Sequence, residues 1–299
     1  MAEPNVLGID HPLVTVRDMD AACRAYERMG FRPAPRGRHP WGTANNLILF
    51  PHCFIEILGV YDGTLLGRGG IADGAAFSGF IRDYLAQRDG GISLMALHSD
   101  DIRADHDAVE ARGCKSTGLV NFRRAVTLPD GSKDEAVVSL SVLINKDFPN
   151  ISTFICQQHK PHLVWVADWL KHPNKADGIL GVTYVADEPV VLLPYYQALY
   201  GPEKISESDG GLRIRTSNGA IDVIPPALMP ERFPLAEPFL PPANMRPCGA
   251  AIRVRSPDMN AVARCLATNG VPYVEDKSGV IRVAPDQACG VILEFAVVI

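Results

Sequence analysis

The sequence predicts an α+β fold built from four repeated βαβββ units. The main observation is an internal repeat: a strand, a capping aspartate, a helix and a closing glycine recur with an offset of 83 residues. At this offset Asp18 matches Asp101, and Gly30 matches Gly113. Two looser copies of the same pattern begin near residues 179 and 250.

The first unit is the clearest. Residues 11–16 are extended in character, Asp18 is a suitable N-cap for a helix over 19–29, and two strand-like runs follow at 47–50 and 53–60, joined at Pro51-His52. Side chains alternate along a strand, so His11 shares a face with Leu13 and Thr15. By the same alternation, Glu56 shares a face with Phe54 and Leu58.

The other three units are expected to follow the same order of elements. Their expected strands are 92–97, 137–144, 151–156, 179–185, 212–216, 220–224, 250–254 and 290–298. Their expected helices are 102–112, 190–200 and 259–268, with a turn at Pro129-Asp130-Gly131.

Four such units suit two domains. We expect a pair of units over 1–160 that carries the site, a connector over 161–178, and a degenerate pair over 179–299. The proline-rich stretch 225–247 is expected to be a surface loop or a bracket around the cleft.

Composition narrows the class of protein. The chain has 299 residues, a formal net charge of −5 and an estimated pI near 5.9, which argues against a nucleic-acid partner. We see neither a signal peptide nor an apolar run long enough to span a membrane, so we expect a cytoplasmic protein without a membrane partner. The seven cysteines include no C-x-x-C pair, which indicates reduced thiols rather than a thiolate metal cluster.

His11 and Glu56 are the best candidate catalytic residues. A histidine can bind a metal or act as a base near pH 7, although it can also simply hydrogen-bond at the start of a strand. Glu56 lies in an apolar run, so its carboxylate must be paired, bind a metal or face water. His98 and His159 are the next candidates, each as a further metal ligand or as a base. Alternatively, His98 only precedes a helix and His159 only lies in a surface loop.

A small-molecule substrate would be bound by the loop before the second strand. His39, Trp41, Thr43 and Asn45 offer an aromatic face together with donors and acceptors, although a tight turn would use the same residues. Arg124 is a candidate for holding a substrate carboxylate in a bidentate manner.

Four segments resemble the vicinal-oxygen-chelate superfamily and, within it, the glyoxalase-like family with a GT-x-N motif. They are Asp10-His11 followed by Asp18, the segment 39–45, Phe54-Ile-Glu56-Ile-Leu, and His172-Pro-Asn174. The resemblance implies glyoxalase-like half-barrels around clefts. It also implies a metal cup formed by the first and last strands of two paired units.

In the first unit this resemblance makes His11 and Glu56 the metal ligands. In the second unit the position matching His11 is Leu94, and the position matching Glu56 falls near Cys156 or Gln157. No histidine occurs after residue 172, so a histidine-based site must lie in the N-terminal half. We expect Glu294 of the C-terminal half to be structural.

The leading hypothesis is a metal-assisted lyase, isomerase or hydrolase that acts on a small oxygen-rich molecule. His11 and Glu56 would hold one divalent ion (Zn, Fe, Mn or Ni), which would polarise a carbonyl or stabilise an enediolate. One alternative is an acid–base enzyme that needs no metal. The other is a non-catalytic protein that sequesters a small molecule, as resistance proteins of this superfamily do. The superfamily often pairs units across chains, so a homodimer is a further expectation.

Overall fold

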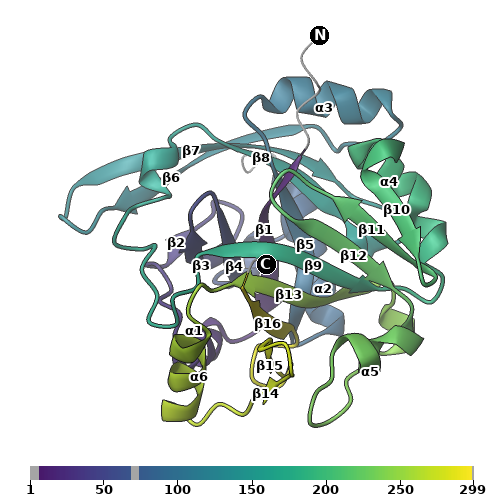
Figure 1. The fold of residues 1–299 in the computed structure, drawn as a ribbon. Helices are drawn as coiled ribbons and strands as arrows, with labels where there is room; N and C mark the ends of the chain where they lie inside the picture. Colours follow the sequence, from purple (N-terminus) through teal and green to yellow (C-terminus); the bar gives the residue numbers. More distant parts are fainter. Residues whose placement is uncertain (1–6, 69–73, 298–299) are drawn as a thin grey trace.

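The computed structural model describes residues 7–68 and 74–297, which form two eight-stranded sheets (Figure 1). The first sheet contains β1 Gly8–Val16, β2 Gly37–Arg38, β3 Thr43–Phe50, β4 Cys53–Val60, β5 Gly90–His98, β6 Leu119–Thr127, β7 Lys133–Leu143 and β8 Thr153–Gln158. The second contains β9 Gly178–Val185, β10 Ile205–Ser208, β11 Gly211–Arg215, β12 Ala220–Ile224, β13 Cys248–Arg255, β14 Val274–Glu275, β15 Ile281–Val283 and β16 Ile292–Ala296.

Both sheets have the same topology. Their strand orders are β2-β3-β4-β1-β5-β8-β7-β6 and β10-β11-β12-β9-β13-β16-β15-β14. In each sheet the first strands of two consecutive units, β1 with β5 and β9 with β13, pair antiparallel at the centre. The predicted α+β class with repeated βαβββ units is therefore confirmed, and the units pair in consecutive order.

The helices begin where the sequence predicts caps. Asp18, Asp101 and Asp258 each accept a hydrogen bond from a backbone N–H in the first turn of the helix that follows. Gly30 and Gly113 adopt φ values of 84° and 100°, which a residue with a side chain rarely adopts. The helices are α1 Met19–Arg28, α2 Ala75–Gln87, α3 Ile102–Ala111, α4 Leu193–Tyr200, α5 Met229–Arg232 and α6 Met259–Thr268.

Several elements differ from the expectations. Helix α4 begins at Leu193, after a 3₁₀ turn over Pro189–Leu192, because Pro194 has no N–H and fits only the first turn of a helix. The turn at residues 129–131 joins β7 to β6, a strand that was not predicted. Helix α2 was not predicted either, since it lies between the first two units and has no counterpart in the repeat.

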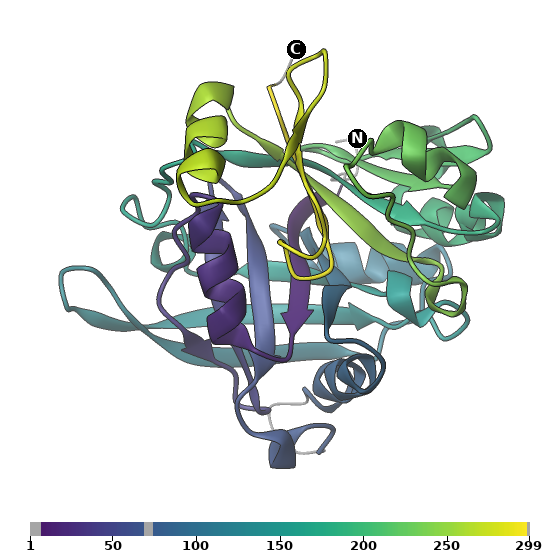
Figure 2. The same cartoon turned by 90° about the horizontal axis from the view of Figure 1, so that it is seen from below.

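The two halves share one hydrophobic core. A single buried cluster contains Ile55 and Ile155 of the first sheet together with Val182 and Leu293 of the second. Helices α1 and α6, one from each half, lie next to each other in both views (Figures 1 and 2). The connector also packs against the first unit, where the His172 ring bonds to the Leu49 carbonyl at 2.9 Å.

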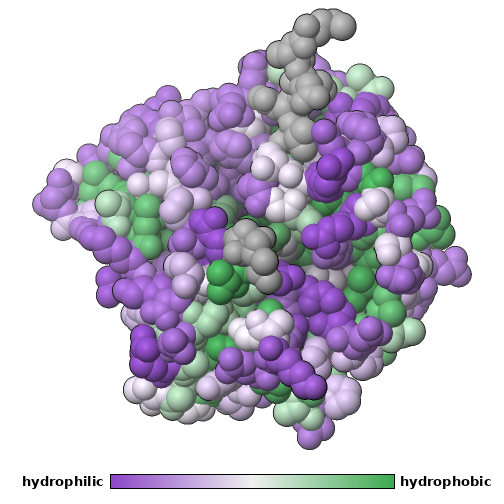
Figure 3. Space-filling model, in the orientation of Figure 1, coloured by the Kyte–Doolittle hydropathy of each residue, from purple (hydrophilic) through white to green (hydrophobic). Residues whose placement is uncertain are grey.

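The surface is mainly hydrophilic on the face shown in Figure 3, with hydrophobic residues scattered among polar ones. In the described part of the chain, no helix is both long enough and apolar enough to cross a membrane. The association of two chains into a homodimer, which the family resemblance implies, stays a prediction.

Candidate functional site

A small cavity of about 40 Å³ lies against the first sheet, and most of the predicted site residues line it. Its walls come from strands β1, β3, β4, β6, β7 and β8, from helix α2, and from the loops that contain residues 39–41 and residue 164. They are formed by His11, His39, Trp41, Asn45, Leu47, Phe54, Glu56, Phe77, Phe122, Arg124, Val138, Leu140, Phe154, Cys156, Gln158 and Val164.

A β-bulge at Asp10 shapes the polar end of this cavity. The pairing of β1 with β5 skips from Ile9 to His11, which disturbs the usual alternation of side chains along the strand. The carboxylate of Asp10 meets the ring of its own neighbour, with 2.5 Å between Asp10 Oδ1 and His11 Nδ1. Asp10 is fully buried and holds the imidazole from the side away from the cavity, so the other ring nitrogen, Nε2, is directed towards the cavity.

Glu56 lies on the other side of the His11 ring. Its Oε2 is 3.3 Å from His11 Nε2, and its Oε1 accepts a hydrogen bond of 2.6 Å from Asn45 Nδ2. Both His11 and Glu56 are 4% exposed, so neither charge is solvated by bulk water. The imidazole is thus held between two carboxylates at the cavity wall.

His39 continues the hydrogen-bonded chain. Asn45 Nδ2 is 3.3 Å from His39 Nε2, and His39 Nδ1 is 2.8 Å from Thr43 Oγ1. Because the Nδ2 group of Asn45 can only donate, Nε2 of His39 accepts and its Nδ1–H donates to Thr43. His39 is therefore a neutral imidazole, and Thr43 orients it without lining the cavity itself.

The pKa values follow from these contacts. Burial alone would lower the pKa of His11, but hydrogen bonds to Asp10 and Glu56 outweigh it and raise the pKa to about 9. Burial would raise the pKa of Glu56 and of Asp10, yet the contacts with His11 hold both pKa values below their usual range. Burial lowers the pKa of His39 to about 4. At neutral pH the site thus contains an imidazolium between two carboxylates, next to a neutral histidine.

The rest of the cavity is aromatic and apolar. The His11 ring stacks on Phe54, with centroids 4.0 Å apart, and meets Phe154 edge-on at 5.5 Å. The His39 ring stacks on Trp41 at 5.2 Å. These rings exclude water, which strengthens the electrostatic interactions between the polar groups.

Three polar groups at the cavity have no partner among the described residues. Asn45 Oδ1 and Trp41 Nε1 are buried without a hydrogen bond. Arg124 makes no ion pair within residues 7–68 and 74–297, and burial lowers the pKa of its guanidinium. Arg124 lines both the cavity and a neighbouring groove of about 140 Å³, so its side chain lies between the two.

His98 and His159 lie outside the cavity. His98 is on the far side of Asp10, with its Nδ1 3.1 Å from Asp10 Oδ2, so it reaches His11 only through that carboxylate. His159 is exposed, and its Nε2 is 2.7 Å from Ser139 Oγ. Neither ring supplies the further cavity ligand that the sequence suggested for it.

The donor set does not fit a resident metal ion. Among the described residues, no group of three or more His, Cys, Asp or Glu side chains is placed to hold one. The register explains this: Leu13 pairs with Glu56 in the first unit, and Ala96 pairs with Phe154 in the second. The position that matches Glu56 is therefore Phe154, which corrects the expectation of Cys156 or Gln157. Leu94 matches His11 and Phe154 matches Glu56, so two of the four expected ligand positions carry hydrocarbon side chains that cannot bind a metal.

Sequence reasoning missed Asp10, Phe77 and Phe154. Asp10 was noticed only as part of a motif, because strand alternation places it on the face opposite His11. Phe77 comes from helix α2, which lies outside the repeat. The repeat offset alone could not have found Phe154, because 98 residues rather than 83 separate it from the matching Glu56.

Solved structures support the fold. A hypothetical protein from Staphylococcus aureus has a TM-score of 0.68 at 13% identity, with 98% of this chain and 100% of that one covered. A mutant of 4-hydroxymandelate synthase from Streptomyces coelicolor gives 0.58 at 11%, covering 98% and 92%. A Mn(II)-bound glyoxalase from Novosphingobium aromaticivorans gives 0.54 at 13%, covering 97% and 82%. At these identities the likeness concerns the fold alone.

The sequence comparisons place the chain in a family. No curated protein matches the sequence. A family model described as a glyoxalase-like domain matches residues 9–200, which include the whole of the first sheet from Ile9 onwards and every residue that lines the cavity. The chain therefore belongs to the glyoxalase-like domain family, with the fold of the vicinal-oxygen-chelate superfamily.

Proposed function

We propose that this protein is an acid–base enzyme that needs no resident metal and that enolises a small 2-oxo carboxylate. The observation that carries the proposal is the buried pair of His11 and Glu56, 3.3 Å apart at the cavity wall. A protonated imidazole and an ionised carboxylate at this separation can give one proton to a substrate and take another from it.

The first step of the proposed reaction conserves charge within the cavity. Glu56 takes a proton from the carbon next to the substrate carbonyl, and His11 gives its Nε2 proton to the carbonyl oxygen. The substrate becomes an enol, and the imidazolium–carboxylate pair becomes a neutral imidazole and a carboxylic acid. Burial disfavours charged groups, so it reduces the cost of neutralising a pair whose mutual contact otherwise favours the charged forms.

The other polar residues would bind and orient the substrate. Arg124 can hold the carboxylate, since its guanidinium has no carboxylate partner among the described residues. Asn45 keeps Glu56 in place through its amide. Asp10 keeps the ring of His11 oriented. The volume of the cavity, about three times what one water needs, favours substrates of a few heavy atoms.

The experiment is solvent-deuterium exchange followed by proton NMR. Protein dialysed against a chelator is incubated in D₂O with pyruvate or 2-oxobutyrate, and loss of the C3 proton signal is measured. We expect exchange by the wild type, and a decrease of about 10²–10⁴-fold in Glu56→Gln and in His11→Gln. Asp222→Asn is the control, because Asp222 occupies the matching position in the second sheet.

Three outcomes would contradict the proposal. Exchange by the Glu56→Gln variant at the wild-type rate would remove Glu56 as the base. Exchange that disappears on chelation and returns with Mn(II) would favour the metal-assisted hypothesis. Tight binding of the oxo acid without exchange would favour the sequestering alternative.

A further inference from the structure

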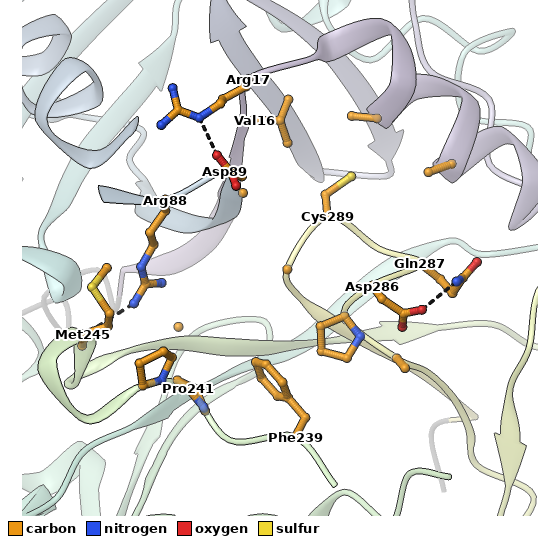
Figure 4. Close-up of a pocket in the computed structure, with 18 of the residues that line it drawn as sticks. Val16, Arg17, Arg88, Asp89, Phe239, Pro241, Met245, Asp286, Gln287 and Cys289 are labelled. Atoms are coloured by element: carbon orange, nitrogen blue, oxygen red, sulfur yellow. Dashed lines mark hydrogen bonds and ion pairs between the residues drawn. The ribbon is translucent and has the colours of Figure 1, made fainter. Parts of the chain in front are cut away.

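The largest cavity described lies outside the candidate active site. Its volume is about 940 Å³, within the range of roughly 300–1,000 Å³ that is typical of sites for small molecules. One wall comes from the end of β1, helix α1 and residues 87–90, and the other from residues 237–249 and 284–290 (Figure 4). It therefore lies between the two halves of the chain.

The proline-rich segment forms the apolar wall of this cavity. Phe239, Pro241 and Met245 line it from one side, and Ala22 and Ala25 of helix α1 line it from another. The sequence suggested that this segment could bracket a cleft. It does bracket one, but the cleft is the cavity between the halves and not the cavity at His11.

Arg88 is a cation whose partners in this cavity are neutral. Its guanidinium lies 3.4 Å from the Met245 carbonyl oxygen and 3.5 Å from the Tyr84 hydroxyl, and it stacks over the Tyr84 ring at 5.5 Å. Burial raises the pKa of the nearby Cys248 thiol, so that group stays protonated at neutral pH. Within the described part of the chain, no carboxylate forms an ion pair with Arg88.

The other charged groups are either paired or exposed to solvent. Arg17 pairs with Asp89 at 2.5 Å, and the exposed Asp286 accepts a hydrogen bond of 2.7 Å from Gln287 (Figure 4). Asp18 is exposed as well and caps helix α1. The remaining carboxylate in the walls, that of Glu237, is exposed and screened by water. Arg88 is thus the partly buried charge that is available to a ligand.

We propose that this cavity binds an amphipathic carboxylate. The carboxylate would form a bidentate pair with the Arg88 guanidinium, and an apolar body would lie against Phe239, Pro241 and the alanines of helix α1. This site is separate from the one proposed for catalysis, and it accepts a larger molecule.

The test compares 2-naphthoate with 2-naphthamide, which has nearly the same shape and no charge. Isothermal titration calorimetry on the full chain measures both dissociation constants. We expect the wild type to bind 2-naphthoate at least about tenfold more tightly than the amide, since pairs between charged groups are the stronger hydrogen bonds. Arg88→Gln removes that preference and leaves amide binding unchanged, whereas Ala25→Phe narrows the cavity and weakens binding of both molecules.

Two controls make the result specific. Arg17→Gln changes the affinity for 2-naphthoate by less than about threefold, because this arginine is exposed to solvent and already pairs with Asp89. Glu56→Gln leaves both affinities unchanged, which separates this site from the catalytic proposal. Equal affinity for the two probes in the wild type, an unaltered preference in Arg88→Gln, or no binding of either probe would overturn the inference.

Discussion

The two sheets share one strand order but carry different residues at matching positions. Leu13 of β1 pairs with Glu56 of β4, and Thr183 of β9 pairs with Asp222 of β12. The position of His11, two residues before Leu13, is occupied in the second sheet by Gly181. The fully buried Asp10 is matched by Leu180. The second half therefore lacks both the imidazole and the carboxylate that orients it.

In the last strand of the second unit of each sheet, it is the second sheet that carries the carboxylate. Ala96 pairs with Phe154 in the first sheet, and Arg253 pairs with Glu294 in the second. The carboxylate of Glu294 is fully buried and is held by three arginines: Arg232 at 2.7 and 2.9 Å, Arg282 at 2.8 Å and Arg253 at 3.3 Å. Burial would raise the pKa of Glu294, but the contacts with Arg232 outweigh it and lower the pKa.

This comparison separates two uses of a buried carboxylate on one scaffold. Arginines saturate Glu294, and an arginine stays charged at any physiological pH, so the network contains no group that can exchange a proton with a substrate. Glu56 is instead bonded to a histidine and an amide at the wall of a cavity, and the histidine can lose its proton. We interpret the first arrangement as structural and the second as chemical.

The largest expected effect concerns the structural network. Glu294→Leu should lower the free energy of unfolding by about 3–5 kcal/mol, because it removes a fully buried carboxylate that the buried Arg282 and the partly buried Arg232 share. Urea unfolding measures this loss. Glu275→Leu, at an exposed position of the same half, should change the stability by no more than about 0.5 kcal/mol. Equal losses in the two variants would contradict the structural interpretation.

A smaller loss is expected at the chemical site. His11→Leu should cost about 2–3 kcal/mol at pH 7, since it leaves two buried carboxylates with fewer hydrogen bonds. The loss is smaller than for Glu294→Leu, because each carboxylate retains one hydrogen-bond partner. Asp10 retains His98, and Glu56 retains Asn45. Urea unfolding at pH 7 and again near pH 4 checks this: the cost should shrink at the lower pH, and a cost independent of pH would argue against unpaired carboxylates.

The pH dependence of stability gives a third distinction. The pKa of His11 is about 9 in the folded protein, above the ordinary value of 6.5. Its contribution is therefore fully present below about pH 6.5 and is lost as the pH rises through 9. The wild type should lose about 2.5 kcal/mol over this window, and His11→Leu should lose much less. Parallel curves for the two proteins in urea unfolding between pH 6 and 10 would refute the raised pKa.

His39 gives an effect of similar size in the opposite pH direction, because burial lowers its pKa to about 4. The unfolded chain binds a proton at this residue near pH 6.5, whereas the folded protein does not until about pH 4. Stability should therefore fall by about 2.5 kcal/mol more in the wild type than in His39→Gln as the pH drops from 6.5 to 4. Thermal unfolding of both proteins across this range measures the difference, and a steeper fall in His39→Gln would reverse the assignment.

The sequence predicted the repeat, the helix caps and the proximity of two candidate residues, because these depend on local patterns. Asp18 and Asp101 cap their helices as expected, and His11 and Glu56 meet as expected. What the sequence could not show depends on register and on insertions. The bulge at Asp10 is a property of the pairing with β5, and Phe77 reaches the cavity from a helix that the repeat does not contain.

The proton on His11 is the central claim, and NMR can observe it directly. The imidazole nitrogen signals of His11 in selectively labelled protein are followed from pH 5 to 11, before and after adding one equivalent of Zn(II) or Mn(II). We predict a pKa of about 9 and no stoichiometric change on adding the metal. A pKa near 6.5 would contradict the proton on His11 at neutral pH. A signal that shifts or broadens fully with one equivalent of metal would show that His11 is a metal ligand rather than half of a proton-transfer pair.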